Sequence, residues 1–306
     1  MKHVFIINPN TVKKLREKLI SDIKAACEAE GVEWEIYYTD APRDAEKHTR
    51  ELAETGVAYR VYACGGDGTL GEVANGAFGF PNVEIAAIPG GTGNDFVRNF
   101  APAEAFADIR RQIRGMACEF DLIKYNGRFA VNTINIGFDC AVVDYVERHR
   151  GRPLMKGSNS YTVAAFIEMF PMPKCSLKLT YDGRTEEQRL TLCSIANGRY
   201  CGGGFKSNPL ALLDDGKFDV FRADEKVGRL GFLKLVGKYR EGTHLECEKM
   251  KDRLSYFRTD GMTVSSDKPF KFCVDGEVEE ADELKLSVVP AAMRFVIPEG
   301  AALTSV

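Results

Sequence analysis

A glycine-rich segment with one acid, Gly65-Gly66-Asp67-Gly68-Thr69, has the residue types of a phosphate-binding loop. It follows a short apolar run and precedes a helical pattern. Glycines let the backbone approach phosphate oxygens, and the N-terminus of the next helix offers N–H donors and a favourable dipole. The spacing is not that of a Walker loop. The alternative is a tight turn that only packs a helix on a sheet.

Two further polar segments follow apolar runs in the same way. They are Asn8-Pro9-Asn10-Thr11 and Pro89-Gly90-Gly91-Thr92-Gly93-Asn94-Asp95-Phe96. If the runs are parallel strands, all three segments emerge at the carboxyl edge of one sheet, where nucleotides bind. Convergence of three polar loops favours a binding site over three unrelated turns.

A separate candidate is Asp275-Gly276-Glu277, which follows the apolar run 270–274. A carboxylate placed there on a rigid strand could accept a proton from a hydroxyl group. The alternative is an ordinary exposed hairpin turn of the kind that Asp182-Gly183 also suggests.

The elements that would position these segments change in character along the chain. Residues 1–121 alternate between strands (4–7, 34–38, 59–64, 85–88) and helices (12–29, 44–54, 70–77), which predicts a parallel sheet covered on both faces. After a hairpin at Asn126-Gly127 and a helical stretch over 141–170, broken near 151–158, the pattern favours strands at 176–181, 188–196, 217–222, 254–257, 262–265, 270–274, 284–289 and 293–297. We therefore expect an α/β nucleotide-binding domain, 1–121, and a mainly antiparallel β-sandwich domain, 122–306. The last strand, 293–297, could return to the first domain.

Taken together, the motifs resemble those of the diacylglycerol kinase catalytic-domain family, which includes soluble bacterial lipid kinases and the sphingosine kinases. The resemblance rests on 65–69, 89–96, Gly202-Gly203-Gly204-Phe205 with Asn208-Pro209, Asp214-Asp215-Gly216, and 275–277. It covers nearly the whole chain. It implies an ATP-binding α/β lobe joined to a β-sandwich lobe, with catalysis in the cleft between them.

The resemblance also implies roles for individual residues. The nucleotide-binding positions would be Asn8, Asn10, Thr11, Thr39, Gly65, Gly66, Asp67, Gly68, Thr69, Glu72, Thr92 and Asn94. The Mg²⁺ positions would be Asp67, Asp95, Asp121 and Asp215, with Leu212 and Lys217 contributing only backbone carbonyls. Glu277 would be the general base, with Asp275 beside it.

Two positions depart from the family pattern. Thr11 and Val12 stand where the family has Ser-Gly, and Gly71 stands where it has Asn before Glu72. Neither change removes an acid. Both therefore bear on nucleotide affinity more than on the reaction.

Composition narrows the class of protein. The 306 residues carry a net charge of −3, so nothing indicates nucleic-acid binding, and charged residues interrupt every apolar run. Nine scattered cysteines with four histidines argue against disulfides and zinc and for a reduced, cytoplasmic chain.

A basic cluster at 148–156 before the apolar stretch 161–170 could lie on an anionic inner membrane surface, or form an ordinary amphipathic core helix. A free strand edge would permit a homodimer.

We therefore expect an ATP- and Mg²⁺-dependent lipid kinase of phospholipid biosynthesis, with diacylglycerol as the first choice of acceptor and phosphatidic acid as its product. Phosphatidyl lipids, sphingoid bases and isoprenoid alcohols stay open as acceptors. An NAD kinase shares the 65–69 motif and is the alternative enzyme. A nucleotide-binding regulator without turnover is the alternative outside catalysis.

Overall fold

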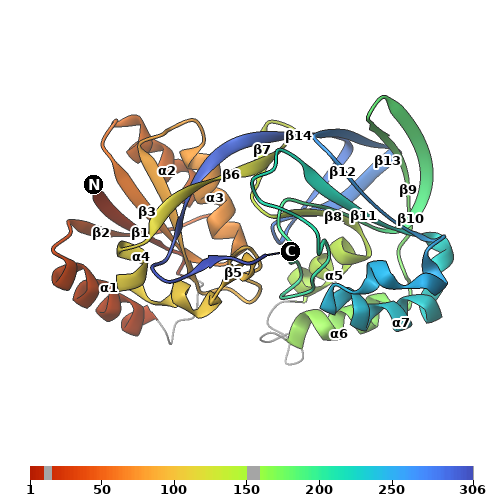
Figure 1. Ribbon diagram of the computed structural model, residues 1–306, viewed down its shortest axis with the longest axis horizontal. Coiled ribbons are helices and arrows are strands. Elements are labelled where there is room, and N and C mark those ends of the chain that lie inside the picture. Colours follow the sequence, from red (N-terminus) through yellow and green to blue (C-terminus); the bar gives the residue numbers. More distant parts are fainter. Residues whose placement is uncertain (10–15, 150–158, 306) are drawn as a thin grey trace. The chain divides into compact units, whose positions relative to one another are not determined.

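The computed structural model describes residues 1–9, 16–149 and 159–305, which form two compact units (Figure 1). Unit 1 contains residues 1–121 and 290–305, and unit 2 contains residues 122–289. The chain thus has the two-part architecture that the change of pattern predicts.

Unit 1 is built on four parallel strands. These are β1 (Lys2–Ile7), β2 (Trp34–Tyr38), β3 (Tyr59–Gly65) and β4 (Val83–Pro89), in the order β2-β1-β3-β4. The helices α1 (Arg16–Glu30), α2 (Asp44–Glu54) and α3 (Asp67–Ala77) alternate with them. β1, β3 and β4 are almost wholly buried, as expected for parallel strands covered on both faces.

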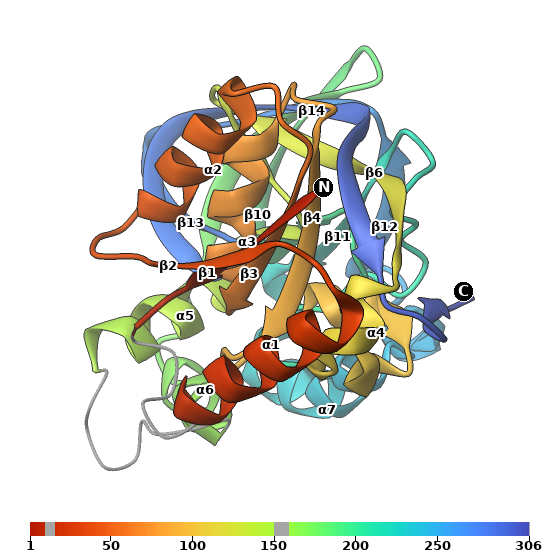
Figure 2. The same ribbon diagram turned by 90° about the vertical axis from the view of Figure 1, so that its left-hand side faces the viewer.

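The two faces of this sheet are covered by different helices (Figure 2). On one face, α1 and the short helix α4 (Ile109–Ile113) pack against Phe5, Tyr62 and Ile88. α2 and α3 pack together on the other face, and α3 contacts β3 and β4. The alternation of strand and helix in the first third of the sequence therefore positions the carboxyl ends of all four strands.

The C-terminal residues complete unit 1. Phe295, near the end of β14 (Glu277–Ile297), pairs in parallel with Ile85 of β4. Its ring lies 4.9 Å from that of Phe96 and 5.7 Å from that of Phe100, between ring centroids. The short strands β5 (Phe100–Ala101) and β15 (Ala302–Leu303) pair antiparallel. Residues from both ends of the sequence thus share one core.

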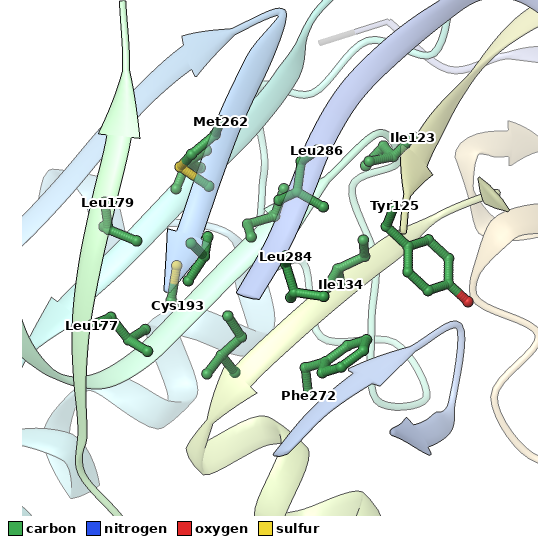
Figure 3. Packing of buried hydrophobic residues seen from close by; sticks show 14 of the residues in the cluster. Ile123, Tyr125, Ile134, Leu177, Leu179, Cys193, Met262, Phe272, Leu284 and Leu286 are labelled. Atoms are coloured by element: carbon green, nitrogen blue, oxygen red, sulfur yellow. The ribbon is translucent and has the colours of Figure 1, made fainter. Parts of the chain in front are cut away.

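Unit 2 is mainly antiparallel. Its strands are β6 (Met116–Tyr125, which begins in unit 1), β7 (Arg128–Ala130), β8 (Thr133–Gly137), β9 (Cys175–Tyr181), β10 (Arg184–Ala196), β11 (Phe218–Asp224), β12 (Leu254–Thr259), β13 (Gly261–Val274) and the first part of β14. β8 and β9 each pair with both β10 and β13, so these four strands enclose a core. Figure 3 shows side chains of this core, among them Leu179, Cys193 and Phe272.

Three helices cover the other face of the β10–β11 region. They are α5 (Phe138–Arg148), α6 (Asn159–Glu168) and α7 (Gly228–Glu241). They pack over Leu192, Phe221 and Ala223. Short 3₁₀ turns complete the chain at Phe96–Asn99, Ala103–Ala107, Glu225–Val227, His244–Glu246 and Glu248–Met250.

Several predictions for unit 2 need correction. The strands predicted at 262–265 and 270–274 form the single strand β13, whose pairing is irregular between Ser265 and Phe270, around Pro269. Those at 284–289 and 293–297 belong to β14, where Ala291 after Pro290 has φ +51°. In both places the strand continues through a proline, with a local irregularity in the pairing or in the backbone. Helix α7 was not predicted, although Phe232, Leu235 and Tyr239 have helical spacing.

The tight turns were predicted correctly. Asn126-Gly127 and Asp182-Gly183 both have two positive φ angles, as a type I′ hairpin turn requires. They join β6 to β7 and β9 to β10.

Replacing Phe295 tests whether the C-terminal strand is part of the unit 1 core. Phe295→Ala removes a fully buried ring from the aromatic cluster, and we expect it to lower the free energy of unfolding by about 3–5 kcal/mol. Denaturant titration measures this. Met116→Ala, at a side chain that is 74% exposed, is the control and should change little. Equal effects of the two variants would contradict this view of the core.

Candidate active site

The strand register of unit 1 brings the predicted nucleotide loops together. Ile7 pairs with both Tyr38 and Cys64, and Cys64 pairs with Ile88, so four strands end at one level. The loops that follow at 8, 39, 65 and 89 therefore share the carboxyl edge. The chain order reverses between β1 and β3, and this switch point is where open α/β sheets bind ligands.

The two glycine loops touch through their backbones. Gly90 N–H donates to Gly65 O at 2.8 Å. A Cβ on Gly91 would lie 2.5 Å from Gly66 Cα, so only glycine fits there. Gly66 caps α3, which begins at Asp67. The contact thus leaves a helix N-terminus, with its N–H donors, beside the second loop.

Asp67 connects the first glycine loop to the second. Its Oδ1 accepts the backbone N–H groups of Asp95 at 2.8 Å and Phe96 at 3.3 Å. Its Oδ2 and Asp95 Oδ2 both face Gly93, where a Cβ would lie 2.9 and 3.2 Å from them. Burial raises the pKa of Asp67, and the backbone N–H donors oppose that rise. Two carboxylates therefore converge at the edge of the sheet.

The other motif residues of the second loop differ in accessibility. The Asn94 side chain accepts Gly91 N–H at 3.0 Å and donates to Gly91 O at 2.8 Å, so it closes the loop on itself. Thr92, at the loop tip, is exposed. Thr92 is therefore accessible to a ligand, whereas Asn94 holds the loop in shape. In the first loop, the Thr69 side chain packs directly against Gly65.

Glu72 has a structural partner. Its carboxylate accepts the N–H groups of Arg43 at 2.9 Å and Ala45 at 3.1 Å, at the start of α2. It therefore fixes α2 to α3, and a direct contact with nucleotide would have to compete with these bonds. Thr39 is buried and its N–H donates to Ile7 O. Of the first loop, Asn8 donates its N–H to Cys64 O, while Asn10, Thr11 and Val12 lie outside the described residues.

Asp121 is a further buried acid of unit 1. Its Oδ1 accepts the N–H of Ala291 at 2.9 Å, at the point where β14 has its positive φ. This bond ties the middle of β6 to the returning C-terminal strand.

In unit 2, Asp275 and Glu277 have different environments. The Asp275 carboxylate is buried and accepts the N–H groups of Val131, Asn132 and Thr133 at 2.7–3.0 Å. Glu277, two residues on, starts β14 and is exposed. Asp275 and Gly276 both have positive φ, so they form the turn of the β13–β14 hairpin. Asp275 therefore positions the hairpin, and Glu277 is the exposed acid of the two.

Asp215 lies in the loop before β11. It accepts Lys217 N–H at 3.1 Å, and its carboxylate is paired with the Arg258 guanidinium, whose Nε also lies 3.7 Å from Asp219. Leu212 is half-buried and Lys217 exposed. A cation bound at Asp215 would share this carboxylate with Arg258, a residue that the sequence did not single out.

The acidic residues fit a hydrated Mg²⁺ better than a closed metal cage. Among residues 1–9, 16–149 and 159–305, no three His, Cys, Asp or Glu side chains converge as a ligand cluster. Mg²⁺ usually keeps several waters and takes one or two carboxylates plus phosphate oxygens. The pair Asp67 and Asp95 offers such a donor set.

Unit 2 also holds a pocket that was not predicted from the sequence, although Gly202 and Phe205 of the 202–205 motif line it. Its walls are mostly apolar and aromatic, and come largely from α5, α6 and α7, including Phe138, Tyr161 and Phe232. At its base, Asp139 accepts a hydrogen bond from Tyr239 Oη at 2.7 Å, and burial raises the pKa of Asp139 to about 6. The position of Asp139, just after the buried strand β8, was the available signal.

Comparison with known proteins divides the chain in the same way. Residues 2–125 match the diacylglycerol kinase catalytic domain, and residues 132–297 match the YegS C-terminal NAD kinase beta sandwich-like domain. The "Probable lipid kinase YegS-like" of Stenotrophomonas maltophilia is 30% identical over 287 residues, 90% of each chain. A protein of the same name from Xanthomonas euvesicatoria is 28% identical over 88% of each chain. A crystal structure of a diacylglycerol kinase from Bacillus anthracis superposes with a TM-score of 0.71 at 20% identity, over 97% of each chain. That structure shows a shared fold.

Two variants separate the roles of the neighbouring acids. Asp275→Asn weakens three charge-assisted hydrogen bonds to the backbone, so we expect a loss of about 2–4 kcal/mol in the free energy of unfolding. Glu277→Gln, at an exposed position, should lose less than about 0.5 kcal/mol. Denaturant titration of both variants checks this. An equally stable Asp275→Asn protein would show that the hairpin does not depend on the carboxylate.

Proposed function

This chain belongs to the family of YegS-like lipid kinases, and on that premise we propose that it transfers the γ-phosphoryl group of ATP to the hydroxyl group of a membrane lipid. Diacylglycerol is the proposed acceptor and phosphatidic acid the product. The observation that carries the proposal is the convergence of the glycine loops, held by backbone contact at a helix N-terminus.

The nucleotide phosphates would bind in unit 1 at the carboxyl edge of the sheet. The start of α3 would offer the backbone N–H groups of Gly66, Gly68 and Thr69 to the phosphates. Thr92 would contact the nucleotide from the second loop. Asn8 and Thr39 would lie at the neighbouring strand ends. Asn10 and Thr11 belong to this proposal on the family resemblance alone.

Mg²⁺, when bound, would neutralise charge on the phosphates during transfer. Asp67 and Asp95 would hold it through water, and Asp121, in the same unit, belongs to this proposal on the family resemblance. Asp215, with the carbonyls of Leu212 and Lys217, would be a second position in unit 2, in competition with Arg258.

Glu277 is the proposed general base. As the lipid oxygen bonds to the γ-phosphorus, the bond from that phosphorus to the bridging oxygen of ADP breaks, and Glu277 takes the hydroxyl proton. Asp275 would orient this acid by fixing the hairpin from the buried side. The apolar pocket with Asp139 at its base is the proposed location of the acyl chain.

We further propose that the protein works in the cytoplasm, at the inner membrane surface. All nine cysteines are free thiols, as in a reducing compartment. Of the helices in the described ranges, none is long and apolar enough to cross a bilayer. A homodimer stays a prediction that analytical ultracentrifugation can test.

The first experiment is transfer of labelled γ-phosphate from MgATP to a lipid extract in detergent micelles. A labelled lipid made by the wild-type protein establishes the activity and identifies the acceptor. Labelled NADP from NAD would instead support an NAD kinase, with which the 65–69 motif is shared. ATP binding without any phosphoryl transfer would support the alternative that the protein is a nucleotide-binding regulator without turnover.

Glu277→Gln should abolish this transfer, because the amide cannot accept the proton. We expect turnover to fall by at least about 100-fold. The dissociation constant for MgATP should change less than about twofold, since the proposed partner of Glu277 is the lipid hydroxyl group and glutamine has the same size as glutamate. Steady-state kinetics and calorimetry measure the two quantities. Undiminished turnover would remove Glu277 from the mechanism.

Asp67→Asn tests the role of the converging carboxylates. The amide keeps an acceptor oxygen for the N–H groups of Asp95 and Phe96 but removes the charge that would attract Mg²⁺. We expect the stimulation of ATP binding by Mg²⁺ to fall by about tenfold or more. Calorimetry with and without Mg²⁺ measures it, and Asp22→Asn on the exposed side of α1 is the control. Equal stimulation in both variants would exclude Asp67 as a metal position.

A further inference from the structure

Helix α7 of unit 2 presents a mixed apolar and basic face to solvent. Leu230 is 78% exposed and Leu233 is 48% exposed. Arg229, Lys234 and Lys238 surround them and are also exposed. The only acid of the helix is its last residue, Glu241. A surface helix normally exposes charges and buries its leucines, so these two leucines need an explanation.

The neighbouring helix extends this apolar surface. Phe166 of α6 is 58% exposed, and Phe170, one turn beyond it, is 76% exposed. Both helices pack through their other sides into one core, where Ala164 of α6 meets Phe232 and Leu235 of α7. Four large apolar side chains are therefore exposed on α6, on the turn that follows it and on α7. We call these four residues, with Arg229, Lys234 and Lys238, the α6–α7 face.

The charges of this region are uneven. A groove beside the start of α7 is lined by Lys174, Arg189 and Arg229. Lys174 and Arg189 share one carboxylate, that of Glu225, at 3.2 and 3.4 Å. Arg229, Lys234 and Lys238 form no ion pair within the described residues. The nearest acid of α6, Glu168, is half-buried, and burial raises its pKa. The face is thus net positive although the whole chain carries −3.

We propose that the α6–α7 face is a docking surface for a bilayer containing anionic phospholipid. Exposed leucines and phenylalanines flanked by unpaired basic side chains are what such a surface requires: the rings and leucines enter the acyl boundary, and the bases meet lipid phosphates. The same two helices contribute Tyr161, Ala165, Phe232 and Val236 to the apolar pocket of unit 2. This inference rests on the proposed function in one respect: docking would bring the pocket to the membrane lipid that the protein phosphorylates.

The basic residues of this face come from a different segment than the sequence suggested. The cluster predicted at 148–156 lies largely outside the described residues, and Arg148 pairs with Asp144 at 2.5 Å. The exposed apolar residues of α6 agree with the predicted stretch 161–170. The bases that accompany them come from α7, some 60 residues later in the chain.

Vesicle binding tests the proposal without ATP or turnover. The full chain is sedimented with phosphatidylcholine vesicles, with and without phosphatidylglycerol, at low and high salt. We expect binding to the anionic vesicles that weakens with salt. Leu230→Glu with Leu233→Glu should weaken it by about tenfold or more for each leucine. Arg229→Gln with Lys234→Gln should weaken it by about fivefold for each charge and reduce the salt dependence.

Matched controls lie elsewhere on the surface. Met116→Glu alters an equally exposed apolar side chain of β6, and Lys178→Gln removes an exposed base of β9. Both should bind vesicles as the wild type does. The proposal is overturned if the double glutamate variant, with unchanged circular dichroism, binds as tightly as the wild type. It is also overturned if the controls lose binding equally, or if the double variant loses only a dimer seen by sedimentation velocity.

A short-chain diacylglycerol dissolved as monomers separates this proposal from the proposed function. The double glutamate variant should phosphorylate the monomeric acceptor at the wild-type rate and lose activity only on vesicles. If the wild type phosphorylates neither acceptor, the proposed function fails, while the vesicle measurements still decide the docking surface.

Discussion

The backbone contact between Gly66 and Gly91 is the constraint on which the proposed nucleotide site depends. A single methyl group at Gly91 would overlap Gly66, so the two loops can approach only as glycines. The contact is possible because Cys64 pairs with Ile88, which ends both strands at one level. The sheet register, the glycines of the loops and the start of α3 therefore depend on one another. A shift of one residue in the β3–β4 pairing would separate the loops and turn the side chains of one strand to the opposite face.

Several acids of the motifs hold the backbone in place. Asp67 joins the two loops, Glu72 fixes the start of α2, and Asp275 fixes the β13–β14 hairpin, each by accepting two or more backbone N–H groups. A carboxylate can accept several such hydrogen bonds, so it can hold neighbouring backbone segments in a fixed position. In the proposed reaction this rigidity would serve phosphoryl transfer, which depends on placing charged groups before the reaction begins. The residues left accessible, Thr92 and Glu277, are then the ones best placed to meet ligands.

The sequence predicts local features well and distant ones poorly. The range 44–54 of α2, the type I′ turns and the alternation of strands and helices in unit 1 follow from periodicity and turn chemistry, which act over a few residues. The gaps predicted at 266–269 and 290–292 do not interrupt β13 and β14, because strand pairing on either side of each gap carries the backbone through it. The partners of Glu72, Asp215 and Asp275 lie 27 to 144 residues away in the chain. No local sequence pattern therefore reveals which of these carboxylates already form hydrogen bonds or ion pairs within the protein. Exposure of α7 is likewise a property of packing, not of composition.

A long-chain lipid acceptor imposes a requirement that the nucleotide does not. Moving an acyl chain into water costs about 0.8 kcal/mol per methylene, so drawing a long chain through water would cost on the order of 10 kcal/mol. An enzyme meets this requirement when its acyl pocket opens where protein and bilayer touch. Helices α6 and α7 provide part of the pocket wall with Tyr161 and Phe232, and they expose Phe166 and Leu230 to solvent. If the pocket and the α6–α7 face act as proposed, the same helices receive the lipid and hold the protein at its source, and the exposed leucines of α7 have a function.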